Sequence, residues 1–151
     1  MKLVGNFGEP GLSRICQSHP GWGFVEFLGW LDDGRVIGIL AECRAGIVTL
    51  RPTSNYLTSL PVKLFEYMAA GLPVIASDFP AWRELLGEVG CALFVDPRDP
   101  RGIANAIQWL LDHPVEAEAM GRRGQEAIVE HFNWENEARA LLELYRELLH
   151  E

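Results

Sequence analysis

Lys63 and Glu66 are the two side chains whose types and spacing could most directly do chemistry. They stand three residues apart in a segment with apolar residues at helical spacing, so on a helix they would share one face. A lysine offers a cation to a phosphate, and an ionised carboxylate can accept hydrogen bonds from two sugar hydroxyls. The pair therefore suits a nucleotide. The alternative is an ordinary surface Lys–Glu pair worth about 0.2–0.5 kcal/mol to a helix, and spacing by itself favours that alternative.

A polar segment, residues 51–60, comes directly before this helix and is crowded with hydroxyl and amide side chains. It is long for a connection between a strand and a helix, which indicates binding rather than mere linkage. Pro61 is predicted to be the first helical residue, where a missing N–H costs nothing. The amides of Val62 and Lys63, with the positive end of the helix dipole, would then face the polar segment and could bind an anion.

Five short apolar segments are predicted to be strands: 3–7, 25–28, 46–50, 73–76 and 92–95. The last three are apolar almost throughout, which is typical of parallel strands covered on both faces. Helical spacing is found at 32–44 and 61–70, and Asp99 followed by Pro100 predicts a capped helix start. Helices are therefore expected on both sides of the sheet, with 46–50 and 73–76 as central strands joined by the helix from Pro61.

The alternation of strands and helices predicts an α/β fold with one doubly wound, Rossmann-like parallel sheet. Residues 115–131 and 134–150 are predicted to form a helical C-terminal tail, and residues 1–151 to form a single domain. Ligands of such sheets bind outside the carboxyl ends of the strands. The 51–66 region follows a strand, so it is predicted to lie at the ligand-binding edge.

Composition excludes several classes of function. The chain has 151 residues, 48% of them apolar, and a formal net charge of −8, which is the wrong sign for a nucleic-acid-binding surface. Its three cysteines have no CxxC spacing and its histidines lie in different segments, so neither a disulfide framework nor a metal site is expected. The start does not resemble a secretory signal, and no apolar run is long enough to span a membrane. A cytoplasmic protein is predicted, with no membrane contact through this domain.

The segment 59–77, SLPVKLFEYMAAGLPVIAS, resembles the signature of the group 1 glycosyltransferases, which are retaining enzymes of the GT-B fold. A looser resemblance extends over most of the chain, including residues 4–6, 25–31 and 93–97. It implies the C-terminal, nucleotide-sugar-binding half of such an enzyme.

In that family Glu66 would hold the ribose hydroxyls of the donor. Lys63 would neutralise phosphate, as in a branch of the family with Pro-x-Lys before the helical glutamate. Thr58 stands where the family signature has its first acidic residue, eight positions before Glu66, so its contact to the donor sugar would be a neutral hydrogen bond. The resemblance places the remaining donor contacts at Ser59, Leu60 and Val62, and base or turn contacts at Gly5, Asn6, Trp30 and Leu31.

The resemblance also implies a nucleoside-diphosphate sugar as donor substrate, with no separate cofactor. The acceptor-binding domain is not in this chain, so no complete catalytic set is expected and the isolated chain is predicted to be inactive. Uridine, guanosine and adenosine donors all stay open, as do the sugar and the acceptor. Two other functions also stay open: a non-catalytic nucleotide or nucleotide-sugar binding module, favoured by Thr58, and a GT-B nucleotide-sugar epimerase.

Overall fold

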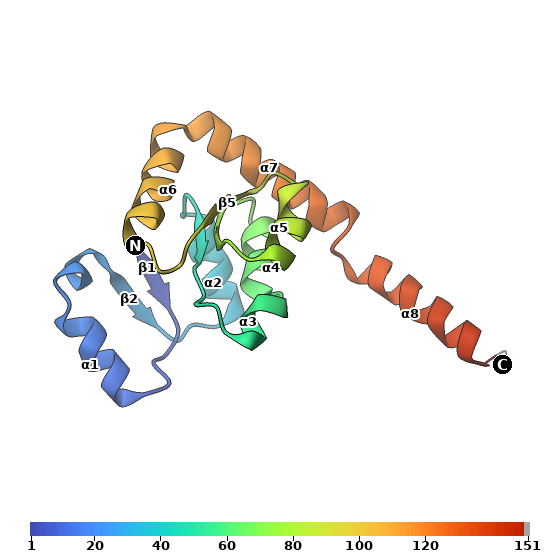
Figure 1. Cartoon of the computed structure of the whole chain (residues 1–151), viewed down its shortest axis with the longest axis horizontal. Coiled ribbons are helices and arrows are strands. Elements are labelled where there is room, and N and C mark those ends of the chain that lie inside the picture. The colour runs from blue at the N-terminus through green and yellow to red at the C-terminus, as the bar shows by residue number, and fades with distance from the viewer. Residues whose placement is uncertain (150–151) are drawn as a thin grey trace. The chain divides into compact units, whose positions relative to one another are not determined.

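The computed structural model describes residues 1–149, except for the side chain of Pro10. The chain forms two compact units, Met1–Glu42 and Cys43–Glu151, which are described separately here (Figure 1). The described residues contain five strands, as predicted, and the α/β fold class is confirmed. The single-domain interpretation stays a prediction. His150, the last residue of the predicted tail helix, lies outside the described residues.

The first unit is built on two parallel strands, β1 (Lys2–Val4) and β2 (Glu26–Gly29). Helix α1 (Pro10–Ser18) and the short 3-10 helix η1 (Pro20–Phe24) connect them, and α2 (Asp33–Leu40) follows. The predicted first strand was too long, because β1 ends at Val4 and the chain turns at Gly5, whose φ is +124°. Helix α1 was not predicted. The Asp32 side chain caps α2 by accepting a hydrogen bond from the Arg35 amide at 3.0 Å.

The second unit contains a three-stranded parallel sheet in the order β3 (Gly46–Val48), β4 (Val74–Ser77) and β5 (Ala92–Val95). The predicted parallel pairing of β3 with β4 is confirmed, with Gly46 opposite Val74. The prediction that both strands are central is right for β4 only, since β3 lies at an edge of this sheet.

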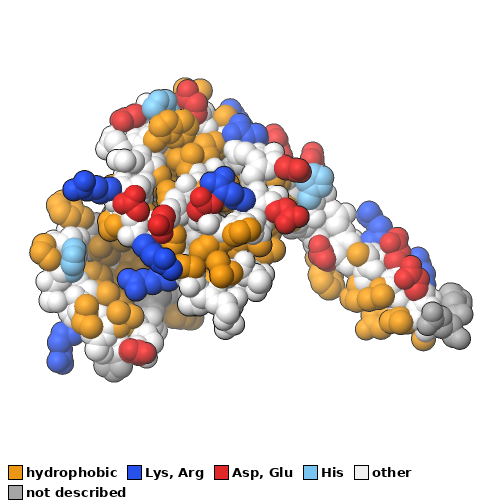
Figure 2. Space-filling view, in the orientation of Figure 1, with side chains coloured by type: hydrophobic (Ala, Val, Ile, Leu, Met, Phe, Trp, Pro, Cys, Tyr) orange, Lys and Arg blue, Asp and Glu red, His pale blue; other side chains and the backbone are white. Residues whose placement is uncertain are grey.

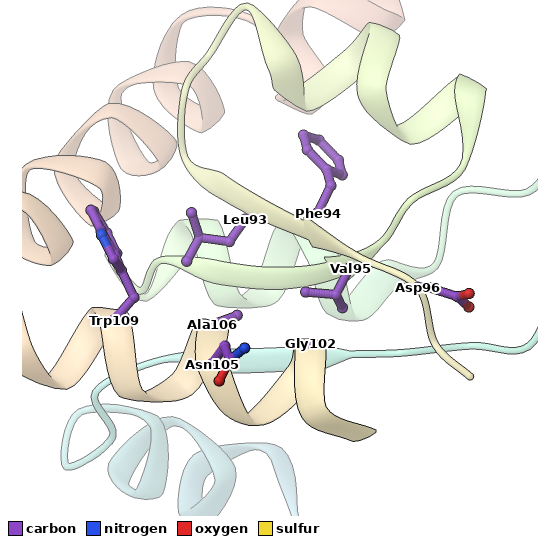
Figure 3. Close-up of a pocket in the computed structure, with 8 residues that line it drawn as sticks. All are labelled: Leu93, Phe94, Val95, Asp96, Gly102, Asn105, Ala106 and Trp109. Atoms are coloured by element: carbon purple, nitrogen blue, oxygen red, sulfur yellow. The ribbon is translucent and has the colours of Figure 1, made fainter. Parts of the chain in front are cut away.

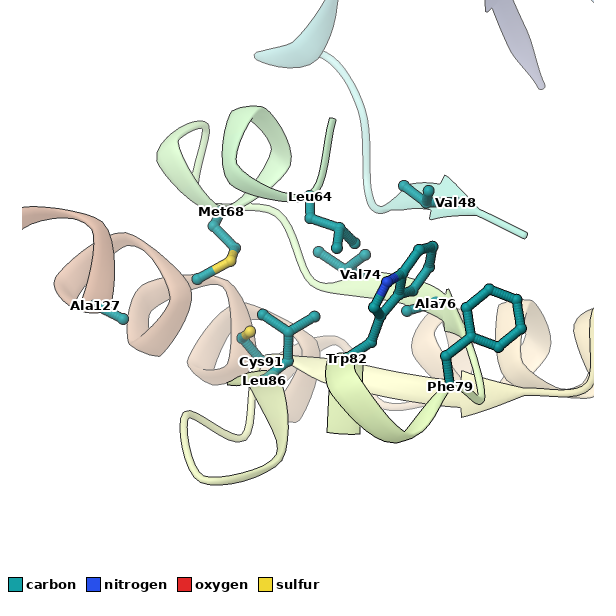
Figure 4. Packing of buried hydrophobic residues seen from close by; sticks show 10 residues of the cluster. All are labelled: Val48, Leu64, Met68, Val74, Ala76, Phe79, Trp82, Leu86, Cys91 and Ala127. Carbon is teal, nitrogen blue, oxygen red and sulfur yellow. The ribbon is translucent and has the colours of Figure 1, made fainter. Parts of the chain in front are cut away.

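Both faces of β4 are covered by helices, as its apolar sequence predicted. Val74 and Ala76 face one core with side chains of α4 (Val62–Ala69), α5 (Pro80–Gly87) and α7 (Pro114–Glu130), shown in Figure 4. Ile75 faces a second core on the other side, with α6 (Pro100–Asp112) and the start of α7. All four residues of β4 are thereby buried.

Helix α4 ends in a Schellman motif that returns the chain to the sheet. The Gly71 amide donates to the Met68 carbonyl and the Leu72 amide donates to the Tyr67 carbonyl, both at 2.9 Å. Gly71 has a φ of +70°, a conformation that glycine adopts without strain. Strand β4 begins three residues later, so α4 spans the distance between the carboxyl end of β3 and the start of β4.

The three C-terminal helices are α6, α7 and α8 (Trp134–Leu149). The predicted start of α6 is confirmed, because Asp99 caps it through a 3.0 Å hydrogen bond from the Arg101 amide. None of the residues 134–149 in α8 is buried. Figure 2 shows apolar side chains along one side of α8 and charged side chains along the other. Among residues 1–149, no helix is both long and apolar enough to cross a membrane.

Candidate functional site

Residues 51–61, which form most of the connection between β3 and α4, are more ordered than the predicted loop. They contain a short helix, α3 (Ser54–Thr58), capped by the Thr53 hydroxyl, which accepts from the Tyr56 amide at 3.4 Å. The polar side chains that suggested a loop therefore serve partly to start this helix, a usual role for threonine and serine.

Helix α4 begins one residue later than predicted. Pro61 is its N-cap with extended φ and ψ of −70° and 135°, and Val62 is the first helical residue. Proline has no polar side chain to cap a helix, and the first amides of a helix lack intrahelical acceptors. Val62 and Lys63 are therefore the first two residues of the helix, so their amides lie at its N-terminus, where the helix dipole favours an anion.

Lys63 and Glu66 lie in the first turns of α4, and both side chains are exposed. Within the part of the chain that the structure describes, no ion pair joins them. The structure thus shows two exposed charges that are not paired with each other, and both interpretations, a nucleotide site and an ordinary solvated helix face, stay predictions. The charge of Glu66 acts on its neighbour: burial, and secondarily the Glu66 carboxylate, raise the pKa of the Tyr67 hydroxyl above its ordinary value.

The 51–61 segment is anchored just before its start, at Leu50, and near its end, at Ser59, by side chains from the β4–α5 region. The buried Ser77 hydroxyl donates to the Leu50 carbonyl at 2.8 Å. The indole N–H of Trp82, also fully buried, donates to the Ser59 carbonyl at 2.8 Å. Sequence reasoning missed both residues. Pro80 followed by Trp82, Leu85 and Leu86 at helical spacing is the signal that could have revealed α5.

The remaining predicted residues of this region lie beside Lys63. Thr58 is the last residue of α3, and its hydroxyl donates to the Ser54 carbonyl at 3.5 Å. Ser59 ends α3 with its amide bonded to the Asn55 carbonyl at 3.1 Å. Leu60 and Val62 have exposed side chains. Thr58 to Glu66 is thus one continuous stretch that runs from the last residue of α3 into α4.

Gly5, Asn6, Trp30 and Leu31 belong to the first unit. The Gly5 amide donates to the Gly29 carbonyl at 2.8 Å, which joins the turn after β1 to the turn after β2. Trp30 is 70% exposed. These four predicted residues therefore follow directly after the ends of β1 and β2 in their own unit, and their contacts with a base stay a prediction.

An open groove of about 470 Å³ lies elsewhere, between β5 and α6 (Figure 3). It is mainly apolar, and its one carboxylate, Asp96, already accepts a hydrogen bond from the Arg98 amide at 2.8 Å. Its lining is Leu93, Phe94, Val95, Asp96, Gly102, Asn105, Ala106 and Trp109. None of the predicted donor residues is in that set, so the groove is a separate feature.

Comparison with known proteins agrees with the geometry. The family model described as "Glycosyl transferases group 1" matches residues 2–113. The chain is 31% identical over 142 residues to MMP alpha-(1→4)-mannosyltransferase of Mycolicibacterium hassiacum, covering 93% of this chain and 31% of the relative. It is 36% identical over 123 residues to phosphatidyl-myo-inositol mannosyltransferase of Mycobacterium leprae, covering 80% of this chain and 31% of that protein.

Among solved structures, sucrose-phosphate synthase from Thermosynechococcus elongatus is similar, with a TM-score of 0.81 and 27% identity. The match covers 98% of this chain and 38% of that one. The chain spans about a third of the length of the two mannosyltransferases that it matches.

Proposed function

Since the chain belongs to the group 1 glycosyltransferases, we propose that it is the donor-binding part of an enzyme that transfers a sugar from a nucleoside-diphosphate sugar. The donor would be the substrate, with no separate cofactor. The acceptor would be bound by sequence that the relatives have and this chain does not span.

The roles of the residues follow from their chemistry at the start of α4. Glu66 would accept hydrogen bonds from the two ribose hydroxyls and fix the nucleoside. Lys63 and the amides of Val62 and Lys63 would face the diphosphate. As the bond to the sugar breaks, negative charge grows on the departing diphosphate, and groups already aimed at it stabilise that charge without having to reorganise.

The observation that carries the proposal is the state of Lys63 and Glu66. Both are exposed, one turn apart on α4, and not paired with each other within residues 1–149. They also sit on a framework held at Leu50 and Ser59 by buried donors. Two opposite charges on one helix, not paired with each other, are what a ligand with phosphates and vicinal hydroxyls would need.

Calorimetry with uridine, guanosine and adenosine diphosphates tests the proposal. At least one should bind the chain, with a dissociation constant in the micromolar to millimolar range because only part of the enzyme is present. Glu126→Gln, an exposed glutamate on α7, is the matched control for Glu66→Gln. If none of the three nucleotides binds at millimolar concentration, the chain is not a donor-binding unit.

A second function, a non-catalytic nucleotide-binding module, is favoured by Thr58 at the family's acidic position. Such a module would use the same nucleotide site as the transferase but would not catalyse sugar transfer. Adding a nucleotide sugar to the whole protein with a candidate acceptor would separate the two: release of nucleoside diphosphate supports the transferase, and tight binding without release supports the module.

A further inference from the structure

We infer that Trp82 and Ser77 are positioning residues that hold the 51–61 segment in the conformation needed for diphosphate binding. The inference rests on the proposed donor-binding function and deepens it, because both residues act through the backbone that leads into α4. Neither residue would touch the ligand itself.

Trp82 fixes the carboxyl end of the segment. Its ring lies in the core between α4 and β4, with Phe79 packed edge-on at 4.9 Å between ring centroids (Figure 4). The polar atom of the ring, the indole N–H, donates a hydrogen bond to the Ser59 carbonyl. The Ser59 amide is itself bonded to Asn55, so both the amide and the carbonyl of Ser59 are fixed. Only Leu60 and Pro61 then separate this fixed residue from the leading amides of α4.

Ser77 fixes Leu50, the residue just before the other end of the segment. It is the one buried polar side chain among the described residues, at the end of the central strand. Its hydroxyl reaches the Leu50 carbonyl at 2.8 Å and lies 3.5 Å from the Val48 carbonyl. Since β3 and β4 already pair through Val48 and Ala76, the Ser77 bond extends this connection beyond the last strand residue.

The two hydrogen bonds connect the same two parts of the chain, which supports a positioning role for both donors. Both donors come from one stretch of chain, β4 followed by α5, and both acceptors are backbone carbonyls of the segment between β3 and α4. A core tryptophan needs a partner for its N–H wherever it is buried. Here that partner is the residue through which the proposed phosphate amides are aligned, so loss of the bond should affect diphosphate binding beyond its effect on folding.

The test compares Trp82→Phe and Ser77→Ala with Leu86→Val in the 151-residue chain. Ser77→Ala removes one donor with little change of shape, and Trp82→Phe removes one donor together with part of the buried ring system. Leu86 is equally buried on α5 in the same core but has no polar contact with the segment, so its variant reports destabilisation alone. Binding of the nucleoside diphosphate and of its nucleoside is measured for all four proteins, well below every melting temperature.

Trp82→Phe and Ser77→Ala should each weaken diphosphate binding by up to about tenfold, because binding must then re-order a segment that one hydrogen bond had held, while nucleoside binding changes much less. Exchange of the Ser59 amide hydrogen, which is bonded to the Asn55 carbonyl, should also become faster in Trp82→Phe. Leu86→Val should leave both affinities unchanged. Two independent donor variants keep the test valid if one of them does not fold.

Unchanged diphosphate affinity in both donor variants would overturn the inference while leaving the proposed function intact. An equal loss in Leu86→Val would also overturn it, because the effect would then follow stability. If the unmodified chain binds none of the three diphosphates, the proposed function fails and the inference fails with it.

Discussion

Gly121 of α7 lies directly against Gly71, the residue that ends the Schellman motif of α4. A Cβ atom at Gly121 would come within 1.9 Å of the Gly71 carbonyl oxygen. Because that oxygen is part of the backbone, it cannot move aside without shifting the start of β4. The close approach of two backbones therefore fixes α7 to the end of the helix that carries Lys63 and Glu66.

Gly121→Ala should consequently lower the free energy of unfolding by about 1–3 kcal/mol, the usual cost of overpacking a closed contact. Gly87→Ala is the matched control, since Gly87 is also helical and nothing lies within 4 Å of its added Cβ. That control should be neutral or stabilising by up to about 1 kcal/mol. Urea unfolding measures both, and equal effects of the two substitutions would contradict the close contact.

Asp78 and Arg83 form a two-bonded ion pair just after β4, with one guanidinium nitrogen 2.9 Å from Oδ2. The hydrogen bond from Arg83 holds the pKa of the Asp78 carboxyl below its usual range. A folded-state pKa below the unfolded value gives stability that is present above about pH 4 and is lost as pH falls through the folded pKa.

Arg83→Gln should therefore raise the Asp78 pKa and flatten the decline in stability below pH 4. An NMR titration of the Asp78 side chain measures the first effect directly. The effect on stability at pH 7 should be small, because both partners are exposed. A titration of Asp78 that is the same in both proteins would rule out this pairing in solution.

Cys91 is fully buried, and burial raises the pKa of its thiol. The reactive species is the thiolate, so Cys91 should react much more slowly with a disulfide reagent at pH 8 than the partly exposed Cys16. The reagent should label Cys91 at a rate limited by opening of the core. Equal labelling of Cys16 and Cys91 in the folded protein would contradict the burial of Cys91.

Helix α8 should contribute little to the stability of the second unit, because none of its residues is buried. Ending the chain at Asn133 should change the free energy of unfolding by less than about 1 kcal/mol, the range of surface changes. Thermal unfolding followed by circular dichroism measures this. A truncated chain that no longer unfolds cooperatively would show that α8 belongs to the core.

Strand positions and fold class could be predicted from the sequence, because buried parallel strands are nearly all apolar and Asp99–Pro100 is a strong helix start. The placement of Lys63 and Glu66 on the same helix could also be predicted from their spacing. What spacing could not reveal was whether the two charges pair, which depends on side-chain directions and neighbours. The short helices α1 and α3 were missed because they are brief; α1 has no side-chain cap at its start, and α3 has no buried residue and only the Thr53 cap.

The roles of Ser77 and Trp82 could not be predicted for a different reason. Each donates to a carbonyl more than 20 residues away, at Leu50 and Ser59, and such contacts exist only once β3 and β4 are paired. Gly121 is a similar case. Only glycine fits there, because a side chain would collide with the backbone of Gly71. Long-range contacts of this kind leave no periodic signal in one sequence.

Binding of a nucleoside diphosphate and its parent nucleoside to Lys63→Ala and Glu66→Gln is the most direct measurement of the donor site. Glu66→Gln should weaken both ligands by about 1.5–3 kcal/mol, since it weakens two charge-assisted bonds to the ribose. Lys63→Ala should weaken the diphosphate far more than the nucleoside and reduce the salt dependence of its binding. Melting temperatures should hardly change. If the variant with both substitutions binds both ligands with wild-type affinity, Lys63 and Glu66 are ordinary solvated surface residues. That result would contradict the donor site.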